Sequence, residues 1–116
     1  MKKIIVNDNY LHSNITGKIL QGFYTVVGDL VNGLKLAIYK KSLVIELTNL
    51  GLNCQENKEL EVFYRGILVG TYTIDLLIDK LVIVKVVNKD KLSRDDEIEI
   101  TNQLKLCDIE VGLLLN

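Results

Sequence analysis

The sequence of 116 residues has no proline, one histidine and two cysteines. It also has no low-complexity segment, linker or internal repeat, so we expect one core rather than several. Cys54 and Cys107 lack the close spacing of a zinc site or a redox pair, and two thiols do not make a disulfide scaffold. We therefore expect two half-buried reduced thiols. His12 has no evident partner, which favours a surface residue over a metal ligand or general base.

Neither sign of charge predominates, because the formal net charge is only -1. The chain as a whole therefore does not attract phosphate backbones, and any nucleic-acid contact needs a local patch. No apolar run approaches the roughly 20 residues of a membrane span, and the apolar start "MKKIIV" stops at Asn7, too early for a signal peptide. We expect no membrane contact and an intracellular location, in the cytoplasm or in a particle assembled inside a cell.

The composition that is present, 48% hydrophobic and 25% charged, is typical of a globular protein. Residues 1–13 are interpreted as a tail or a short extra strand, and residues 14–116 as a single domain. Apolar residues at helical spacing predict a first helix that begins with Ser13 or Asn14 as its N-cap and ends near Asn32-Gly33.

A second helix is predicted over residues 34–50, with Gly51 after its C-terminus. Ile38, Val44 and Ile45 lie off its main apolar stripe, so we expect this helix to be covered on more than one side. The period then changes from 3.6 to 2. Strands are predicted over residues 59–64 and 67–78, with a turn at Arg65-Gly66 between them.

The run "LVIVKVV", residues 81–87, predicts a central strand covered on both faces. Ser93 is suited to cap a third helix, whose inner face carries Ile100, Leu104 and Cys107, and residues 109–115 predict a last buried strand. The expected order is helix, helix, a three-stranded meander, helix and strand. This is an α/β fold with a central mixed sheet flanked by helices.

Local strings in this order resemble a known family over residues 15–116. They are "ITGKIL", "GLKLAIYKKSLVIEL", "LEVFYRGILVGTYTIDLLIDKLVIVK" and "LKLCDIEVGLLLN". The family is the GxxExxxER proteins, which are small members of the PD-(D/E)XK nuclease-like superfamily. The resemblance implies a restriction-endonuclease-like core.

The chain departs from the family at its functional positions. The naming motif would begin at Gly33, but its first glutamate falls on Leu36, its second on Lys40 and its arginine on Lys41. The small residue before this motif is Asn32, where proline is common. Of the strand positions, the aspartate is kept as Asp75, while the E-x-K string reads "KVV", from Lys85 to Val87, and a glutamine of the third helix falls on Glu99.

Such nucleases hold Mg²⁺ or a similar cation with clustered carboxylates, while a lysine orients the nucleophile or stabilises developing charge. Leu36 supplies no ligand, Lys85 repels a cation and Val87 cannot orient water, so only Asp75 remains. We therefore expect no catalytic residue, no metal and no cofactor. No nucleophile motif, phosphate-binding glycine loop or zinc pattern appears, and no small-molecule substrate is evident.

Lys85 suggests a sharper hypothesis: its ammonium group replaces the missing cation in a salt bridge to Asp75. This requires an odd-length turn or a bulge near Asp79-Lys80, which would bring both side chains to one face. Alternatively, Lys85 extends to solvent. In a third arrangement the site has migrated, and Asp75, Lys89 and Glu99 form a new ligand set.

Three functions remain open. The favoured one is a catalytically inactive nuclease-fold protein that acts as an interaction or assembly module, with a protein partner or a second copy bound through Phe63 and the outer face of the first hairpin. The second is a nucleic-acid-binding protein that does not cut, whose groove is lined by Lys35, Lys40, Lys41 and Lys85. The third is a residual metal-dependent nuclease.

Overall fold

The computed structural model describes residues 3–6, 12–88 and 92–116. Its helices and strands follow in the order β1 (Lys3–Val6), α1 (Ser13–Asp29), α2 (Leu36–Asn49), β2 (Cys54–Tyr64), β3 (Ile67–Ile78), β4 (Val82–Val86), α3 (Arg94–Cys107) and β5 (Val111–Leu115). After the first strand this is the predicted succession of helices and strands. The N-terminal segment adds β1, which pairs with β5.

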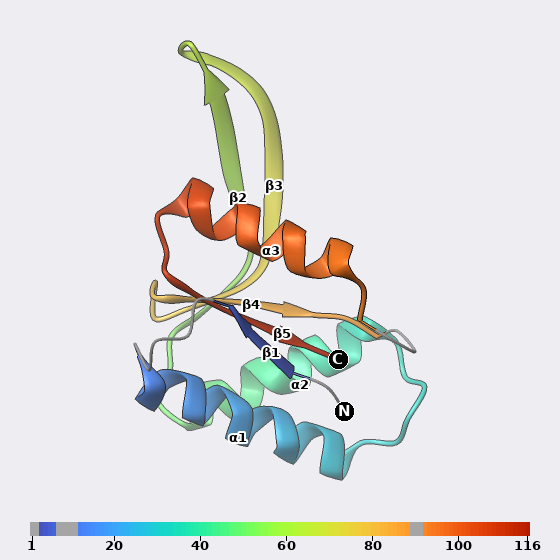
Figure 1. The fold of residues 1–116 in the computed structure, drawn as a ribbon. Coiled ribbons are helices and arrows are strands. Elements are labelled where there is room, and N and C mark those ends of the chain that lie inside the picture. The colour runs from blue at the N-terminus through green and yellow to red at the C-terminus, as the bar shows by residue number, and fades with distance from the viewer. Residues whose placement is uncertain (1–2, 7–11, 89–91) are drawn as a thin grey trace.

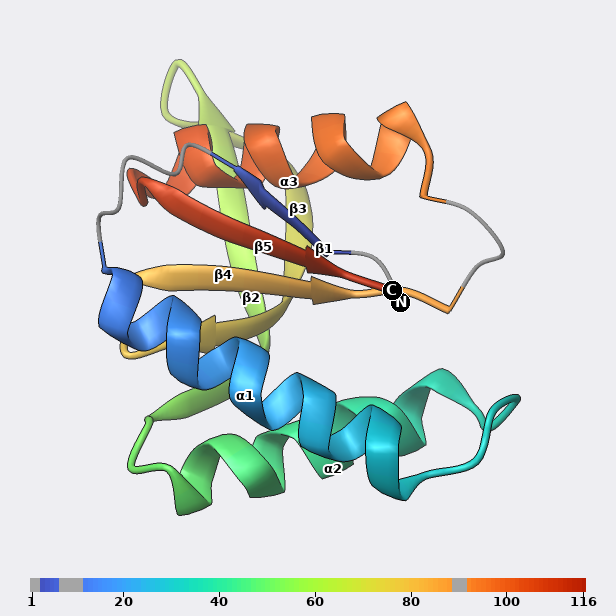
Figure 2. The same cartoon turned by 60° about the horizontal axis from the view of Figure 1, so that its bottom comes forward.

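One five-stranded sheet, in the order β1-β5-β4-β3-β2, forms the middle layer of the molecule (Figure 1). β4 and β5 run parallel and the other neighbours run antiparallel, so the sheet is mixed. Helices α1 and α2 cover one face of the sheet and α3 covers the other (Figure 2). The predicted α/β class, with a mixed sheet flanked by helices, is confirmed, and the architecture is that of a restriction-endonuclease-like fold.

The two faces of the sheet bury separate apolar clusters. The larger cluster joins α1 and α2 to the sheet through side chains such as Ile19, Leu47 and Leu76. The smaller one lies under α3 and consists of Ile74, Leu77, Ile83, Ile100 and Leu104. Alternate residues of β4 therefore serve different clusters, and the strand is covered on both faces as predicted.

Helix α1 differs from its prediction at both ends. The carbonyl of His12 already accepts hydrogen bonds from Ile15 and Thr16, so His12 takes the N-cap position without a side-chain cap. The predicted cap at Ser13 or Asn14 is wrong. The helix also ends at Asp29 instead of near Gly33, because Leu30 is extended and packs its side chain against the larger cluster.

Helix α2 ends as the sequence predicts. Gly51 has a φ of 85°, and the N–H groups of Gly51 and Leu52 donate to the carbonyls of Thr48 and Leu47, which is a Schellman motif. The coverage prediction is only partly right, since Val44 packs on the core but Ile38 and Ile45 are exposed. The reason is that α1 and the sheet lie on one side of the helix and leave the opposite side to solvent.

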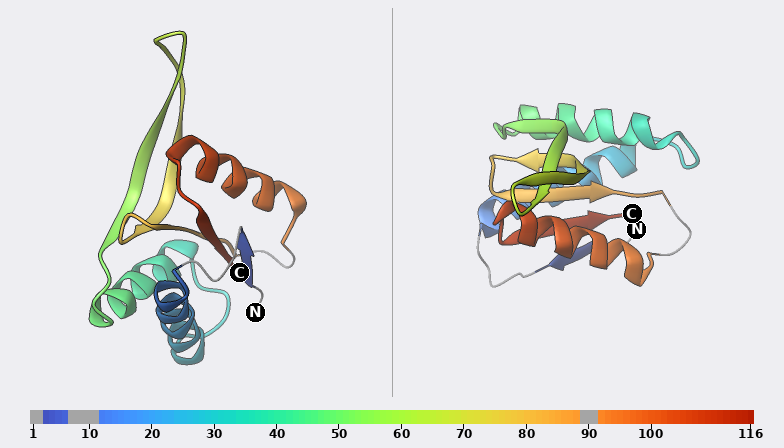
Figure 3. Two further views of the ribbon diagram at one scale, coloured as in Figure 1. Left: turned by 60° about the vertical axis from the view of Figure 1, so that its left-hand side comes forward. Right: turned by 90° about the horizontal axis from the view of Figure 1, so that it is seen from above.

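Strand β2 is longer than predicted because it begins at Cys54. The polar residues that follow Cys54 hide the alternation, but pairing with β3 holds them in the sheet. Arg65 and Gly66 both have positive φ, as the tight turn of a hairpin requires. β3 pairs with β4 only from Leu76 to Ile78, so most of the β2–β3 hairpin projects beyond the sheet (Figure 3).

Helix α3 begins with a capping box. The Ser93 hydroxyl accepts a hydrogen bond from the Asp96 N–H, and the Asp96 carboxylate accepts one from the Ser93 N–H. The predicted cap is therefore confirmed. Ile100 and Leu104 are buried against β5 and the smaller cluster, while Cys107 is half-buried at its rim.

Candidate functional site

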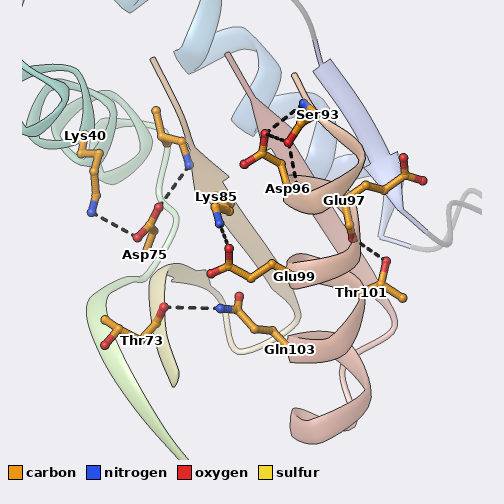
Figure 4. Close-up of polar contacts among 11 residues, drawn as sticks. Lys40, Thr73, Asp75, Lys85, Ser93, Asp96, Glu97, Glu99, Thr101 and Gln103 are labelled. Carbon is orange, nitrogen blue, oxygen red and sulfur yellow. Dashed lines mark hydrogen bonds and ion pairs between the residues drawn. The ribbon is translucent and has the colours of Figure 1, made fainter. Parts of the chain in front are cut away.

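Asp75 lies where β3 leaves the sheet. Its Oδ2 accepts a hydrogen bond from the Val86 N–H of β4 at 3.3 Å, and its Oδ1 lies 3.4 Å from the Nζ of Lys40 on α2 (Figure 4). The Asp75 and Lys40 side chains are only 25% and 18% exposed. The carboxylate is thus held between a backbone donor and an ammonium group.

Lys85 of β4 points to the other side of the sheet. Its ammonium group donates to the carboxylate of Glu99 on α3, with the Lys85 side chain 17% exposed and that of Glu99 44% exposed. Lys85 therefore does not extend to solvent. Figure 4 shows the two ion pairs as separate contacts, one reaching toward α2 and one toward α3.

The predicted Asp75–Lys85 salt bridge is wrong. Its geometric condition is met, because the three-residue connection 79–81 places Ile78 opposite Val82. The pairing ends at Leu76, however, and Ile74 and Leu77 both belong to the cluster under α3, which breaks the alternation of β3 around Asp75. The carboxylate consequently turns toward Lys40 and away from the α3 face.

Two further family positions are apolar and serve packing. Leu36 is partly buried against the larger cluster, one helical turn before Lys40. Val87 is buried, and its N–H donates to the carbonyl of Leu115 on β5 at 2.8 Å. Neither side chain can hold a cation. Asn32 is exposed in the connection before α2.

The proposed basic lining is not one cluster of unpaired charges. Lys40 and Lys85 are mostly buried in ion pairs. Lys41 is 72% exposed and lies 3.1 Å from Glu56 of β2. Lys35 is exposed at the N-cap position of α2. Lys89, which the migrated-site hypothesis needs, lies outside the described residues.

Sequence reasoning missed Gln103 on α3. This side chain is 2% exposed, and its Nε2 donates to the carbonyl of Thr73 on β3 at 3.4 Å. Gln103 follows Glu99 by four residues, so both lie on the helix face that meets the sheet (Figure 4). The four-residue spacing from Glu99 was therefore the sequence signal that could have identified Gln103.

The thiols and the histidine carry no comparable chemistry. Cys54 and Cys107 are free and half-buried, as predicted. Burial raises the pKa of both thiols, although a hydrogen bond with Thr48 opposes the change at Cys54 and Lys58 opposes it at Cys107. Both thiols therefore stay protonated at neutral pH and are poor nucleophiles. His12 is partly buried at the start of α1.

Comparison with known proteins agrees with the fold. The family model of the PD-(D/E)XK nuclease superfamily matches residues 13–116, and the chain therefore belongs to this superfamily. No curated protein and no solved structure matches the chain. The match covers every helix and strand after β1, including both ion pairs.

Membership in the superfamily implies a divalent metal, and the residues present do not fit one. A hard divalent cation needs several oxygen ligands directed at one point. Asp75 and Glu99 are directed at different lysines on two sides of the sheet. Among residues 3–6, 12–88 and 92–116, no group of three or more His, Cys, Asp or Glu side chains is placed to hold a metal ion.

Proposed function

We propose that the chain is a member of the GxxExxxER branch in which the nuclease site is degenerate and the fold acts as an interaction module. The observation that carries the proposal is a pair of largely buried lysines, which stand where the resemblance puts acidic residues. Lys40 contacts the retained Asp75, and Lys85 contacts Glu99. Each carboxylate is thereby neutralised by the protein itself, and a cation would have to displace a lysine to reach it.

The described residues around Asp75 also do not supply the groups that hydrolysis of a phosphodiester needs. Hydrolysis of a phosphodiester requires a positioned water and a cationic group that stabilises the developing charge. Val87 stands where the resemblance puts the catalytic lysine, and its apolar side chain is buried. Lys40 and Lys85 are each paired with a carboxylate of the protein, that of Asp75 and that of Glu99.

A cleavage assay tests this proposal. Supercoiled plasmid, linear duplex and structured RNA are incubated with the wild type and with Asp75→Ala, in buffers containing Mg²⁺ or Mn²⁺. We expect no cleavage above the level of Asp75→Ala, which controls for a contaminating nuclease. Cutting by the wild type that Asp75→Ala abolishes would refute the proposal and support a rebuilt active site.

Nucleic-acid binding without cleavage is the second candidate, with Lys35 and the exposed Lys41 as its donors. Binding of this kind weakens steeply with salt. Fluorescence anisotropy with duplex and single-stranded oligonucleotides at low salt measures it. A salt-dependent signal that Lys35→Glu removes would favour this candidate over the interaction module.

A further inference from the structure

The outer part of the β2–β3 hairpin, residues 58–73, is here called the arm. It projects beyond the sheet and away from α1 and α2 (Figure 3). Its strand pairing places large apolar side chains on both faces, with Leu60 paired with Tyr72 on one face and Phe63 paired with Leu68 on the other. Phe63, Leu68 and Tyr72 are 57%, 50% and 38% exposed. The direction of the arm therefore determines where two apolar surfaces are presented to solvent or to a partner.

The arm leaves the sheet at Asn57 and Asp75. On one side of β3, the pairing with β4 extends only to Leu76. On the other side, within the described residues 12–88, the pairing with β2 omits Asn57 and Asp75, although the residues directly before and after them are paired. Asn57 has a φ of 51°, in the left-handed region that asparagine adopts more readily than most residues. Both ladders that hold β3 are thus interrupted at one point, and this point is the junction of the arm with the sheet.

The side chains of β3 change faces at the same junction. Ile74 belongs to the cluster under α3, whereas Leu76 belongs to the larger cluster under α1 and α2. Regular alternation along a strand would put both residues on one face. The backbone is therefore twisted between the sheet and the arm, and the direction of the arm depends on how this twist is held.

The side chain of Asp75 closes the interrupted ladder. The N–H groups of successive strand residues point to opposite sides, and the Val87 N–H donates to β5, so the Val86 N–H points toward β3. If the β3–β4 ladder continued in its register, the carbonyl of Ile74 would accept from this N–H. Asp75 Oδ2 accepts from it instead, at 3.3 Å. The carboxylate therefore replaces the next backbone acceptor, and β3 leaves the sheet without a stranded donor on β4.

The base of the arm is also held by both helical layers. On the α2 side, the Nζ of Lys40 lies 3.4 Å from Asp75 Oδ1, and both side chains are largely buried. On the α3 side, Gln103 donates to the carbonyl of Thr73 at 3.4 Å (Figure 4). The contact on the α2 side is charged and the one on the α3 side is neutral. Because charge-assisted contacts are the stronger kind, the Asp75 contact has the larger part in holding the junction.

We propose that Asp75 is a positioning residue for the arm. Its carboxylate ends the β3–β4 ladder at Val86 and, held by Lys40, fixes the direction in which the arm projects. The proposal does not rest on the proposed function, because the direction of the arm can be measured whether or not the chain cleaves nucleic acid. Its failure is therefore distinct from a positive cleavage assay.

Distances between two spin labels, measured by double electron–electron resonance, test the proposal. One label is attached near the tip at Val69→Cys, and the other on a helical layer, at Gln21→Cys of α1 or Asn102→Cys of α3, all of which are exposed positions. Cys54 and Cys107 are first replaced by alanine, because both are free thiols. The arm is about 20 Å long, so a turn of about 20°, the usual twist between neighbouring strands, moves its tip by about 7 Å.

Two substitutions of Asp75 separate its contacts. Asp75→Ala removes both of them, whereas Asp75→Asn keeps an acceptor for the Val86 N–H and loses the charge beside Lys40. We expect Asp75→Ala to shift the mean of at least one distance by about 5 Å or to broaden its distribution about twofold. The change in Asp75→Asn should be smaller, because the ladder keeps its acceptor.

The matched control is Glu56→Gln, which removes the Lys41–Glu56 ion pair between α2 and β2 and leaves Asp75 unchanged. Neither distance should change in this variant. Lys40→Met is a second test that preserves the hydrogen bond to Val86, and it should give a smaller shift than Asp75→Ala. Circular dichroism melts establish which variants are folded. Wild-type distances in folded Asp75→Ala, or in Lys40→Met where Asp75→Ala does not fold, would overturn the proposal, as would an equal shift in Glu56→Gln.

Discussion

At the scale of a single residue, the proposed loss of the nuclease site centres on Asp75. Its carboxylate accepts a hydrogen bond from the Val86 N–H and lies beside the ammonium group of Lys40. The Asp75 and Lys40 side chains are both largely buried. Removal of either one therefore leaves a buried charge or an unsatisfied hydrogen-bond donor.

A double-mutant cycle measures this contact. Asp75→Ala should lower the free energy of unfolding by about 2–3 kcal/mol, because it strands the Lys40 ammonium and the Val86 N–H. Lys40→Met should cost about 1 kcal/mol, since the carboxylate keeps its backbone donor. Urea unfolding of the double variant should show a smaller loss than the sum. Strict additivity would mean that the ion pair contributes nothing.

The helix termini show at the scale of elements why two similar serines have different effects. Ser93 exchanges hydrogen bonds with Asp96, whereas the Ser13 side chain is no cap and the Ser13 carbonyl accepts from the Thr16 hydroxyl. The local sequence allows either residue to begin a helix. Only the position of the preceding backbone carbonyl, that of His12 in α1, decides which one does.

Alanine substitutions at the two serines test this difference. Ser93→Ala should lower the free energy of unfolding by about 1 kcal/mol, because it removes an acceptor for the Asp96 N–H. Ser13→Ala, the matched control, should change it by less than about 0.5 kcal/mol. Thermal unfolding of the two variants gives the comparison. Equal losses would show that α1 is capped as its sequence first indicates.

The sequence predicts elements whose signals are local, and it fails where distant segments decide. The turn at Arg65-Gly66, the C-terminus of α2 and the N-cap at Ser93 each depend on a few adjacent residues, and each is confirmed. The start of β2 and the end of α1 depend on pairing with β3 and on the packing of Leu30. These contacts leave no local periodicity to read.

The same limit applies to the candidate site. The resemblance indicates its positions, and the sequence shows that Lys40, Lys85 and Val87 stand at three of them. Their partners are not visible, because the docking of α2 and α3 on opposite faces decides which lysine meets which carboxylate. Regular alternation of side chains along β3 would place Asp75 on the same face of the sheet as Lys85. The alternation is interrupted near Asp75, so its carboxylate lies on the other face.

The two ion pairs connect all three layers of the whole molecule. Lys40–Asp75 joins α2 to β3, and Lys85–Glu99 joins β4 to α3. The two ion pairs thus tie both helical layers to the sheet. No described helix is long and apolar enough to cross a membrane. The β2–β3 hairpin projects away from these layers (Figure 1).

The central claim is that internal lysines have replaced the metal, and calorimetric titration of the wild type and Asp75→Ala with Mn²⁺ tests it most directly. We expect no saturable binding heat in either protein, because neither carboxylate is free to join a multi-oxygen ligand set. Saturable, near-stoichiometric binding to the wild type that disappears in Asp75→Ala would contradict the account.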